Sequence, residues 1–169
     1  MPASDQAVST NRYTLIPRTL IFLTSGDSVL LLKGGPQKRL WAGLYNGIGG
    51  HVERGETIIA AARRELHEET GLERSDLRLC GVITIDTGDQ PGIGLFVFRC
   101  DSASLKGIPL KSSSEGSLEW VPVSALGDLP LVEDLPLLLT RVLGQGETEP
   151  PFFAQYAYDT SGRLVIEFP

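Results

Sequence analysis

The segment Thr57–Thr70 has the pattern of an amphipathic helix, and strand-like segments lie on both sides of it in the sequence. Thr57 is a favourable N-cap residue, and Gly71 is the residue type that most often ends a helix. Apolar residues at helical spacing form one stripe, made of Ile58, Ile59, Ala62 and Leu66. A central helix with strands before and after it predicts an α/β chain, in which a mixed sheet has helices on both faces.

The strand-like segments are nearly continuous apolar runs that end at turn residues. Before the helix they are Leu20–Thr24 and Ser28–Lys33, joined by Ser25-Gly26-Asp27, and a short extended segment near Leu44–Ile48. After the helix they are Leu77–Thr87, Ile93–Cys100 and Leu118–Val121, followed by a second helix at Asp134–Leu143 and a hairpin that turns at Thr160-Ser161-Gly162. We therefore expect one domain, residues 13–169, preceded by a flexible polar arm, residues 1–12.

Composition and charge exclude several classes of protein. Of the 169 residues, 41% are hydrophobic and 21% are charged, as expected for one globular domain. The apolar runs have the length of strands and are too short to cross a bilayer, so no membrane partner is expected. The net charge of −6 argues against binding long nucleic acid, which needs basic contacts to phosphate. An acidic chain can still bind one phosphorylated small molecule if a metal cation offsets the charges.

The cysteines and the N-terminus predict a cytoplasmic location. Cys80 and Cys100 form no CxxC pair and have no zinc-like spacing with His51 and His67. We expect them to be buried thiols rather than a disulfide. The first residues also lack a basic region followed by an apolar stretch, so no secretory signal is expected.

The predicted helix carries three carboxylates, Glu65, Glu68 and Glu69, on one face because a helical turn takes 3.6 residues. Their repulsion is only partly relieved by Arg64, and the helix dipole disfavours acids near the C-terminus. Helix stability therefore does not explain the cluster. One interpretation is an ordinary solvated face. The other is a site for a hard divalent cation such as Mg²⁺, completed by a backbone carbonyl from the preceding glycine turn.

The spacing around these carboxylates is similar to a known motif. Gly50, five residues, Glu56, seven residues, Arg64-Glu65-Leu66, one residue, Glu68-Glu69, one residue and Gly71-Leu72 resembles the Nudix box at every defined position. The resemblance implies the Nudix fold, a mixed sheet between helices (α/β/α) with a C-terminal β-hairpin. It also implies an enzyme that hydrolyses a nucleoside diphosphate linked to another group, with Mg²⁺ or Mn²⁺.

The same resemblance implies roles for individual residues. The metal ligands would be Glu65, Glu68, Glu69 and the Gly49 carbonyl. Arg64 would orient a carboxylate, and Glu56 would brace the loop against the helix, so that Gly50, Glu56 and Gly71 form the structural part of the box. The metals would bridge phosphate oxygens and help to deprotonate the attacking water.

The general base has more than one candidate. The resemblance implies either a glutamate of the box or an acid from a later loop, and Glu115 in "EGSLEW" matches the place of that later acid, as a base and a metal ligand. Glu115 also fits an ordinary exposed loop glutamate. Glu119 is its nearby competitor, although in a strand ending at Trp120 its side chain would point away from Glu115 or into the core.

Residues outside the box resemble MutT-like hydrolases of oxidised purine nucleoside triphosphates. By this resemblance Asn46 would read a purine edge, and Glu133 and Asp134 would contact the base. Each has an alternative, because Asn-Gly is a common turn and acids are common N-caps of a following helix. Trp41 and Tyr45 fit base stacking or core packing. Lys33, Lys38 and Arg39 fit phosphate contacts or a solvated basic loop, and His51 stands where many relatives have lysine.

The sequence thus predicts a metal-dependent pyrophosphohydrolase that releases a nucleoside monophosphate and pyrophosphate, with 8-oxo-dGTP as the favoured substrate. The alternative substrates are ADP-ribose, a dinucleoside polyphosphate or another nucleoside diphosphate derivative, and Pro91 does not decide between them because it also suits a turn. The contrasting class is a non-catalytic nucleotide-binding module, which the intact box disfavours. A homodimer is compatible with the sequence and is not decided by it.

Overall fold

The computed structural model describes residues 12–88, 91–101, 105, 107–110 and 115–169. Residues 1–11 of the predicted arm lie outside this described part. The strands are β1 (Leu15–Ser25), β2 (Ser28–Gly34), β3 (Tyr45–Asn46), β4 (Arg78–Ile85), β5 (Gly92–Asp101), β6 (Gly116–Pro122), β7 (Phe152–Tyr158) and β8 (Leu164–Glu167). The helices are α1 (Ile58–Thr70), the 3₁₀ helix η2 (Val123–Asp128) and α2 (Leu135–Gly144).

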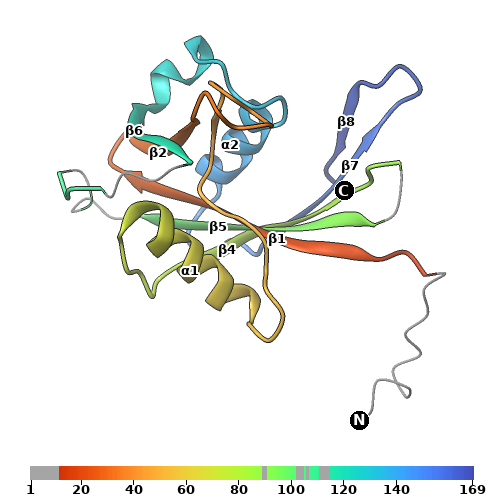
Figure 1. Cartoon of the computed structure of the whole chain (residues 1–169), viewed down its shortest axis with the longest axis horizontal. Helices are drawn as coiled ribbons and strands as arrows, with labels where there is room; N and C mark the ends of the chain where they lie inside the picture. Colours follow the sequence, from red (N-terminus) through yellow and green to blue (C-terminus); the bar gives the residue numbers. More distant parts are fainter. Residues whose placement is uncertain (1–11, 89–90, 102–104, 106, 111–114) are drawn as a thin grey trace.

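The described strands form one mixed sheet in the order β3-β2-β1-β5-β4-β7-β8, with β6 paired to β2. β1 runs parallel to β5, and β4 runs parallel to β7, whereas the other pairs are antiparallel. The β7–β8 hairpin extends the sheet at the end opposite β3 and β6 (Figure 1). The predicted mixed sheet with a C-terminal hairpin is thereby confirmed.

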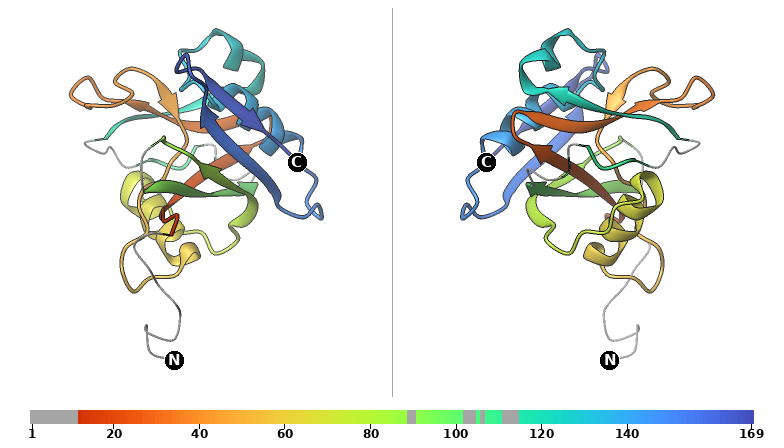
Figure 2. Two further views of the ribbon diagram at one scale, coloured as in Figure 1. Left: turned by 90° about the vertical axis from the view of Figure 1, so that its right-hand side faces the viewer. Right: turned by 90° about the vertical axis from the view of Figure 1, so that its left-hand side faces the viewer.

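One helix covers each face of the sheet. Side chains alternate along β1, so that Ile21 and Leu23 pack with α1 on one face and Leu20 and Phe22 pack with α2 on the other. Figure 1 shows the two helices on opposite sides of the strands, and Figure 2 shows the same layers from two further directions. The α/β/α arrangement confirms the predicted fold class.

Some boundaries differ from the sequence prediction. β1 extends from Leu15, beyond the apolar run Leu20–Thr24, because its pairing with β5 continues through Pro17 and Arg18. The 3₁₀ helix η2 has no strong periodicity and was not predicted. Cys80 and Cys100 are both free and buried, as expected. Among the described residues, no helix has the length and apolar content needed to span a membrane.

Candidate active site

The glycine turn before α1 lies directly against β1. Thr19 donates its backbone N–H to the Gly50 carbonyl at 2.9 Å, and Ile21 donates to the Ile48 carbonyl at 2.7 Å. Gly49 has a φ of +150°, and a Cβ there would lie 2.1 Å from the Thr19 carbonyl oxygen. Position 49 therefore requires glycine so that the turn can approach the strand closely.

Gly50 has a different neighbour. A Cβ at this position would lie 2.4 Å from Oε1 of Glu65, so the Glu65 carboxylate lies over the face of the turn. A side chain end can move, whereas the Thr19 backbone cannot do so cheaply. The two glycines of the turn thus have separate roles, one in the close approach to β1 and one in the placement of a carboxylate.

These contacts predict opposite outcomes for two alanine variants. Gly49→Ala should lower the melting temperature by about 4 °C or more, because backbone atoms of β1 must shift. Gly50→Ala should leave the melting temperature nearly unchanged but lower turnover, because it displaces Glu65. Thermal unfolding and a hydrolysis assay on both variants check this pair. Equal loss of stability in both would contradict the assignment of Glu65 to this position.

Helix α1 begins and ends as the sequence predicts. The Thr57 hydroxyl accepts a hydrogen bond from the backbone N–H of Ala60 at 3.3 Å. Gly71 adopts a left-handed conformation with a φ of 76°, and its N–H donates to the His67 carbonyl. These caps fix the length of the helix and place the three carboxylates in its last two turns.

Arg64 is the centre of an ion-pair network between α1 and the preceding loop. It donates to both carboxylate oxygens of Glu56, at 3.2 and 2.8 Å, and to the His51 carbonyl at 2.9 Å. It also donates to Glu65 at 2.9 Å and to Glu68 at 3.2 Å. Glu56 in turn accepts from the backbone N–H of Glu53, and these bonds lower the pKa of Glu56. The contacts expected of an orienting arginine and a bracing glutamate are therefore present.

Glu69 is buried, with a relative exposure of 6%, and its Oε2 atom has no hydrogen-bond partner among the described residues. Burial, followed by the negative charges of Glu115 and Glu65, raises the pKa of Glu69 to about 8. The charge of Lys38 and a backbone hydrogen bond from Gly49 act in the opposite direction. A buried carboxylate with an unpartnered oxygen beside other acids is costly unless a cation compensates it.

The other candidate acids have defined partners. Glu115 forms an ion pair with Lys38. Glu119 accepts a hydrogen bond from the Tyr45 hydroxyl at 2.7 Å and another from Ser117 at 3.3 Å. Glu119 is hydrogen-bonded to Tyr45, whereas the charge of Glu115 acts on Glu69.

The donor set suits a hard divalent cation. Carboxylate oxygens are the ligands that Mg²⁺ and Mn²⁺ prefer, and Glu69 has an oxygen available. In the described part of the chain no three acidic, histidine or cysteine side chains already converge on one point. Arg64 forms ion pairs with Glu65 and Glu68, and Lys38 forms one with Glu115.

Asn46 lies beside the segment that leads to α2. Tyr45 and Leu131 form a parallel bridge, in which Tyr45 donates to the Pro130 carbonyl at 2.9 Å and Val132 donates to the Tyr45 carbonyl at 3.1 Å. The two chain segments therefore leave this bridge together, one towards Asn46 and the other towards residues 133 and 134. The Asn46 Oδ1 atom accepts from the Gly47 N–H at 2.8 Å, a contact that also fits the turn interpretation.

Asp134 occupies the N-cap position of α2, but its side chain makes no capping hydrogen bond. Burial is the main reason that the pKa of Asp134 is raised, and the neighbouring charge of Glu133 adds to it. Glu133 itself is exposed. The buried Tyr156 hydroxyl has no hydrogen-bond partner among the described residues. Burial is the main cause that raises the pKa of Tyr156, and the charge of Asp134 is the second. No local sequence pattern indicated Tyr156, which lies on the distant strand β7.

The remaining predicted substrate residues lie around β2 and β3. Lys33 pairs with Tyr45 across the two strands, and its ammonium lies 5.3 Å from the centre of the Tyr45 ring. Trp41 is 44% exposed and has a φ of 60°, in the loop between β2 and β3. The structure thus places Lys33 opposite Tyr45, whereas Asn46 pairs with Leu32, and Trp41 lies at the surface. The ion pair of Lys38 with Glu115 was not predicted.

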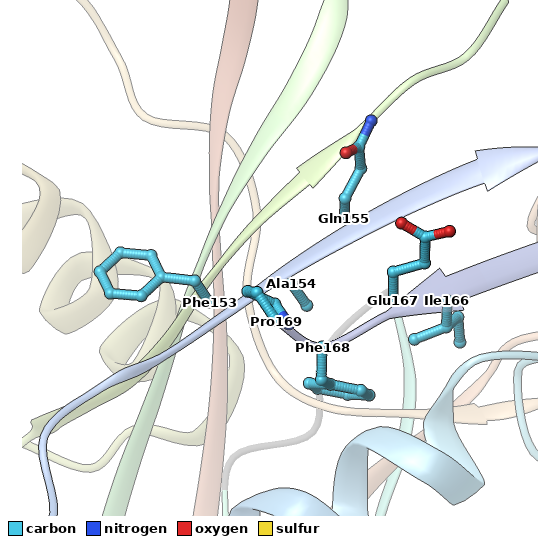
Figure 3. Close-up of a pocket in the computed structure, with 7 residues that line it drawn as sticks. All are labelled: Phe153, Ala154, Gln155, Ile166, Glu167, Phe168 and Pro169. Carbon is cyan, nitrogen blue, oxygen red and sulfur yellow. The ribbon is translucent and has the colours of Figure 1, made fainter.

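Pocket size does not locate this site. A pocket of about 610 Å³ lies on the C-terminal hairpin (Figure 3), lined by Phe153, Ala154, Gln155, Ile166, Glu167, Phe168 and Pro169. None of these residues belongs to the carboxylate cluster or to the segments around Asn46. The pocket on the C-terminal hairpin is therefore separate from the carboxylate cluster around Glu69.

Comparison with known proteins gives three further findings. The family model described as the NUDIX domain matches residues 14–142. The oxidized purine nucleoside triphosphate hydrolase of Danio rerio is 36% identical over 109 residues, which cover 64% of this chain and 67% of that protein. The NAD-capped RNA hydrolase NudC of Pseudomonas aeruginosa is 29% identical over 142 residues, which cover 81% of this chain and 49% of NudC.

Solved structures agree on the fold. The mutator MutT protein from Bacillus halodurans superposes with a TM-score of 0.71, covering 91% of this chain and 97% of that chain. Its sequence identity is 23%, so this similarity is one of fold.

Proposed function

Because this chain belongs to the Nudix hydrolase family, we propose that it is a metal-dependent pyrophosphohydrolase of nucleoside triphosphates. It releases a nucleoside monophosphate and pyrophosphate, and its favoured substrate is an oxidised purine nucleotide such as 8-oxo-dGTP. Mg²⁺ is the favoured cation, and Mn²⁺ has the same preference for oxygen ligands. The observation that carries the reaction is Glu69, a buried acid with an unpartnered oxygen beside other carboxylates.

The chain's own residues would prepare the site for hydrolysis. Glu65, Glu68 and Glu69, with the Gly49 carbonyl, hold the cation, and Arg64 orients Glu65 through their hydrogen bond. Glu115 would be both a further metal ligand and the general base that accepts the proton of the attacking water. When bound, the cation neutralises charge on the phosphates and acidifies water. This arrangement explains how a chain with a net charge of −6 would hold a polyphosphate.

Base recognition is proposed for Asn46 together with Asp134 and Glu133. The parallel bridge between Tyr45 and Leu131 supports a joint role for these residues. It holds the segment that continues to Asn46 beside the segment that continues to residues 133 and 134. The raised pKa of Asp134 favours its protonated form, which can donate a hydrogen bond to a keto oxygen. Lys33 is proposed to contact a phosphate, and Trp41 to stack on the base through its exposed ring.

Two variants of Asn46 separate base reading from turn formation. Asn46→Asp keeps an oxygen that can accept from the Gly47 N–H, but it loses the amide donor. If the amide reads the base, both Asn46→Ala and Asn46→Asp should change the preference between 8-oxo-dGTP and dGTP by roughly tenfold. The ratio of kcat/KM values for the two nucleotides measures this preference. A wild-type ratio in Asn46→Asp would assign Asn46 to the turn alone.

A panel of nucleotides tests the choice of substrate. Oxidised and normal purine triphosphates, ADP-ribose, NAD and a dinucleoside polyphosphate should each be assayed for products with Mg²⁺, and with EDTA as the control. The proposal expects the highest kcat/KM for an oxidised purine triphosphate. Preference for NAD or ADP-ribose would favour the alternative that the similarity to NudC supports. Tight nucleotide binding without turnover on any substrate would favour a binding module.

A further inference from the structure

Lys38 forms an ion pair with Glu115, one of the carboxylates proposed above to bind the cation. We propose that Lys38 is a built-in counter-ion that is exchanged during binding. In the metal-free protein it neutralises Glu115, and when a divalent cation and a polyphosphate bind, Glu115 turns to the cation while Lys38 turns to a phosphate oxygen. This inference rests on the proposed metal-dependent function of the same site.

The backbone of Glu115 is fixed, so that its side chain is the part that turns. Gly35 donates its N–H to the Glu115 carbonyl at 2.9 Å, at the end of β2. The next residue, Gly116, has a φ of +152°, and a Cβ there would lie 2.0 Å from the Lys33 carbonyl oxygen. This close approach holds the start of β6 against β2. The backbone position of Glu115, from which its side chain extends, is therefore defined.

Lys38 lies in the loop that leaves β2, where its backbone N–H donates to the Gly35 carbonyl at 3.1 Å. Gly35 therefore contacts both partners of the ion pair through its backbone. The side chains of Lys38 and Glu115 are 30% and 48% exposed. An ion pair in such contact with solvent is weak, so replacing it with a divalent cation and a phosphate costs little.

Both partners also act on the buried acid. Glu115 interacts unfavourably with the negative charge of Glu69, and Lys38 interacts favourably with it. Lys38 thus offsets part of the negative charge that a bound cation would neutralise. Arg64 is less free to act as such an exchangeable counter-ion, because it is bound to Glu56, to the His51 carbonyl and to two acids of α1.

The first half of the exchange is the replacement of Lys38 by the cation at Glu115. It is tested by a titration with Mn²⁺ alone, in which electron paramagnetic resonance measures the free ion. Lys38→Met removes the competing ammonium and should tighten Mn²⁺ binding by about two- to fivefold. Arg39→Met removes the same charge from the next, exposed residue and should change the affinity less. Unchanged or weaker Mn²⁺ binding by Lys38→Met would overturn the proposal.

A double variant shows whether the effect passes through Glu115. In a Glu115→Gln background, Lys38→Met should no longer tighten Mn²⁺ binding, because the carboxylate that the two cations share is absent. Persistence of the full effect there would overturn the exchange. Failure of the wild-type protein to bind Mn²⁺ would instead contradict the proposed metal site itself, and the exchange with it.

The second half concerns phosphate. With Mn²⁺ at saturation, Lys38→Met should weaken the binding of inorganic pyrophosphate, measured by calorimetry, although it tightens binding of the metal alone. This opposite sign distinguishes an exchanged counter-ion from a lysine that only stabilises the loop. Equal or tighter pyrophosphate binding by Lys38→Met would overturn the transfer of Lys38 to phosphate.

Discussion

Glu69→Gln is expected to abolish most Mg²⁺-dependent turnover, by about 10²–10⁴-fold, while making the metal-free protein more stable at pH 8. The amide keeps the shape of the side chain but removes the charge that burial disfavours. If a residue lowers the stability of the ligand-free protein and is still needed for activity, its role is to bind a ligand and not to stabilise the fold. Near-normal turnover of Glu69→Gln would contradict its place in the site.

The stability gain has a defined pH dependence. The pKa of Glu69 is raised from 4.5 to about 8 in the folded chain, so the folded state holds its proton more tightly than the unfolded state does. Its contribution to stability is full below the unfolded value and is lost as the pH rises towards about 8. In EDTA, wild type should therefore unfold at a lower temperature than Glu69→Gln at pH 8, and at a similar temperature at pH 4.5. Mg²⁺ should close the gap at pH 8 by stabilising only wild type.

Glu73→Gln is the matched control for this experiment. Glu73 lies just after α1 and its side chain is 88% exposed. The same chemical change there should affect neither turnover nor the pH dependence of unfolding. An equal shift of the melting temperature in both variants would show that the effect comes from net charge alone.

Arg64→Ala is expected to lower activity by about 10- to 100-fold, the usual cost of removing a residue that orients metal ligands. It should also lower the melting temperature, because Glu56, Glu65 and the His51 carbonyl all lose their donor. Arg64→Lys should recover little activity, since one ammonium cannot reproduce the planar set of donors. Turnover, metal affinity and thermal unfolding of both variants measure these effects.

The neighbouring Arg63 gives the control for Arg64. Arg63 lies on the same helix and donates to the Ser75 carbonyl at 2.8 Å, outside the carboxylate network. Arg63→Ala should retain wild-type kcat/KM and metal affinity. If Arg63→Ala and Arg64→Ala lose metal affinity equally, the effect is one of helix charge, and the orienting role of Arg64 is wrong.

Features set by local rules could be predicted from the sequence. Helix α1 follows from its apolar stripe, its Thr57 cap and its Gly71 stop, and these residues act within a few positions of one another. The spacing of Glu65, Glu68 and Glu69 likewise follows from helix geometry. The strands could be predicted because each contains an apolar run that ends at turn residues. The extension of β1 beyond its apolar run depends instead on its pairing with β5.

Features that depend on distant contacts could not be predicted. The ion pair of Lys38 with Glu115 joins two loops, and no periodic pattern relates such residues. The bridge between Tyr45 and Leu131 is set by the packing of a whole sheet edge. Asp134 shows the limit of a local rule, because it occupies the predicted N-cap position and yet makes no capping bond. Its half-buried position, from which its charge acts on Tyr156, arises only in the folded chain.

The decisive measurement is pyrophosphate release from 8-oxo-dGTP by wild type and Glu69→Gln, each with Mg²⁺ and with EDTA. We predict release by wild type that requires Mg²⁺ and is lost in Glu69→Gln, whose fold is intact by thermal unfolding. Release that continues in EDTA, or equally in Glu69→Gln, would contradict a metal-dependent reaction at this carboxylate.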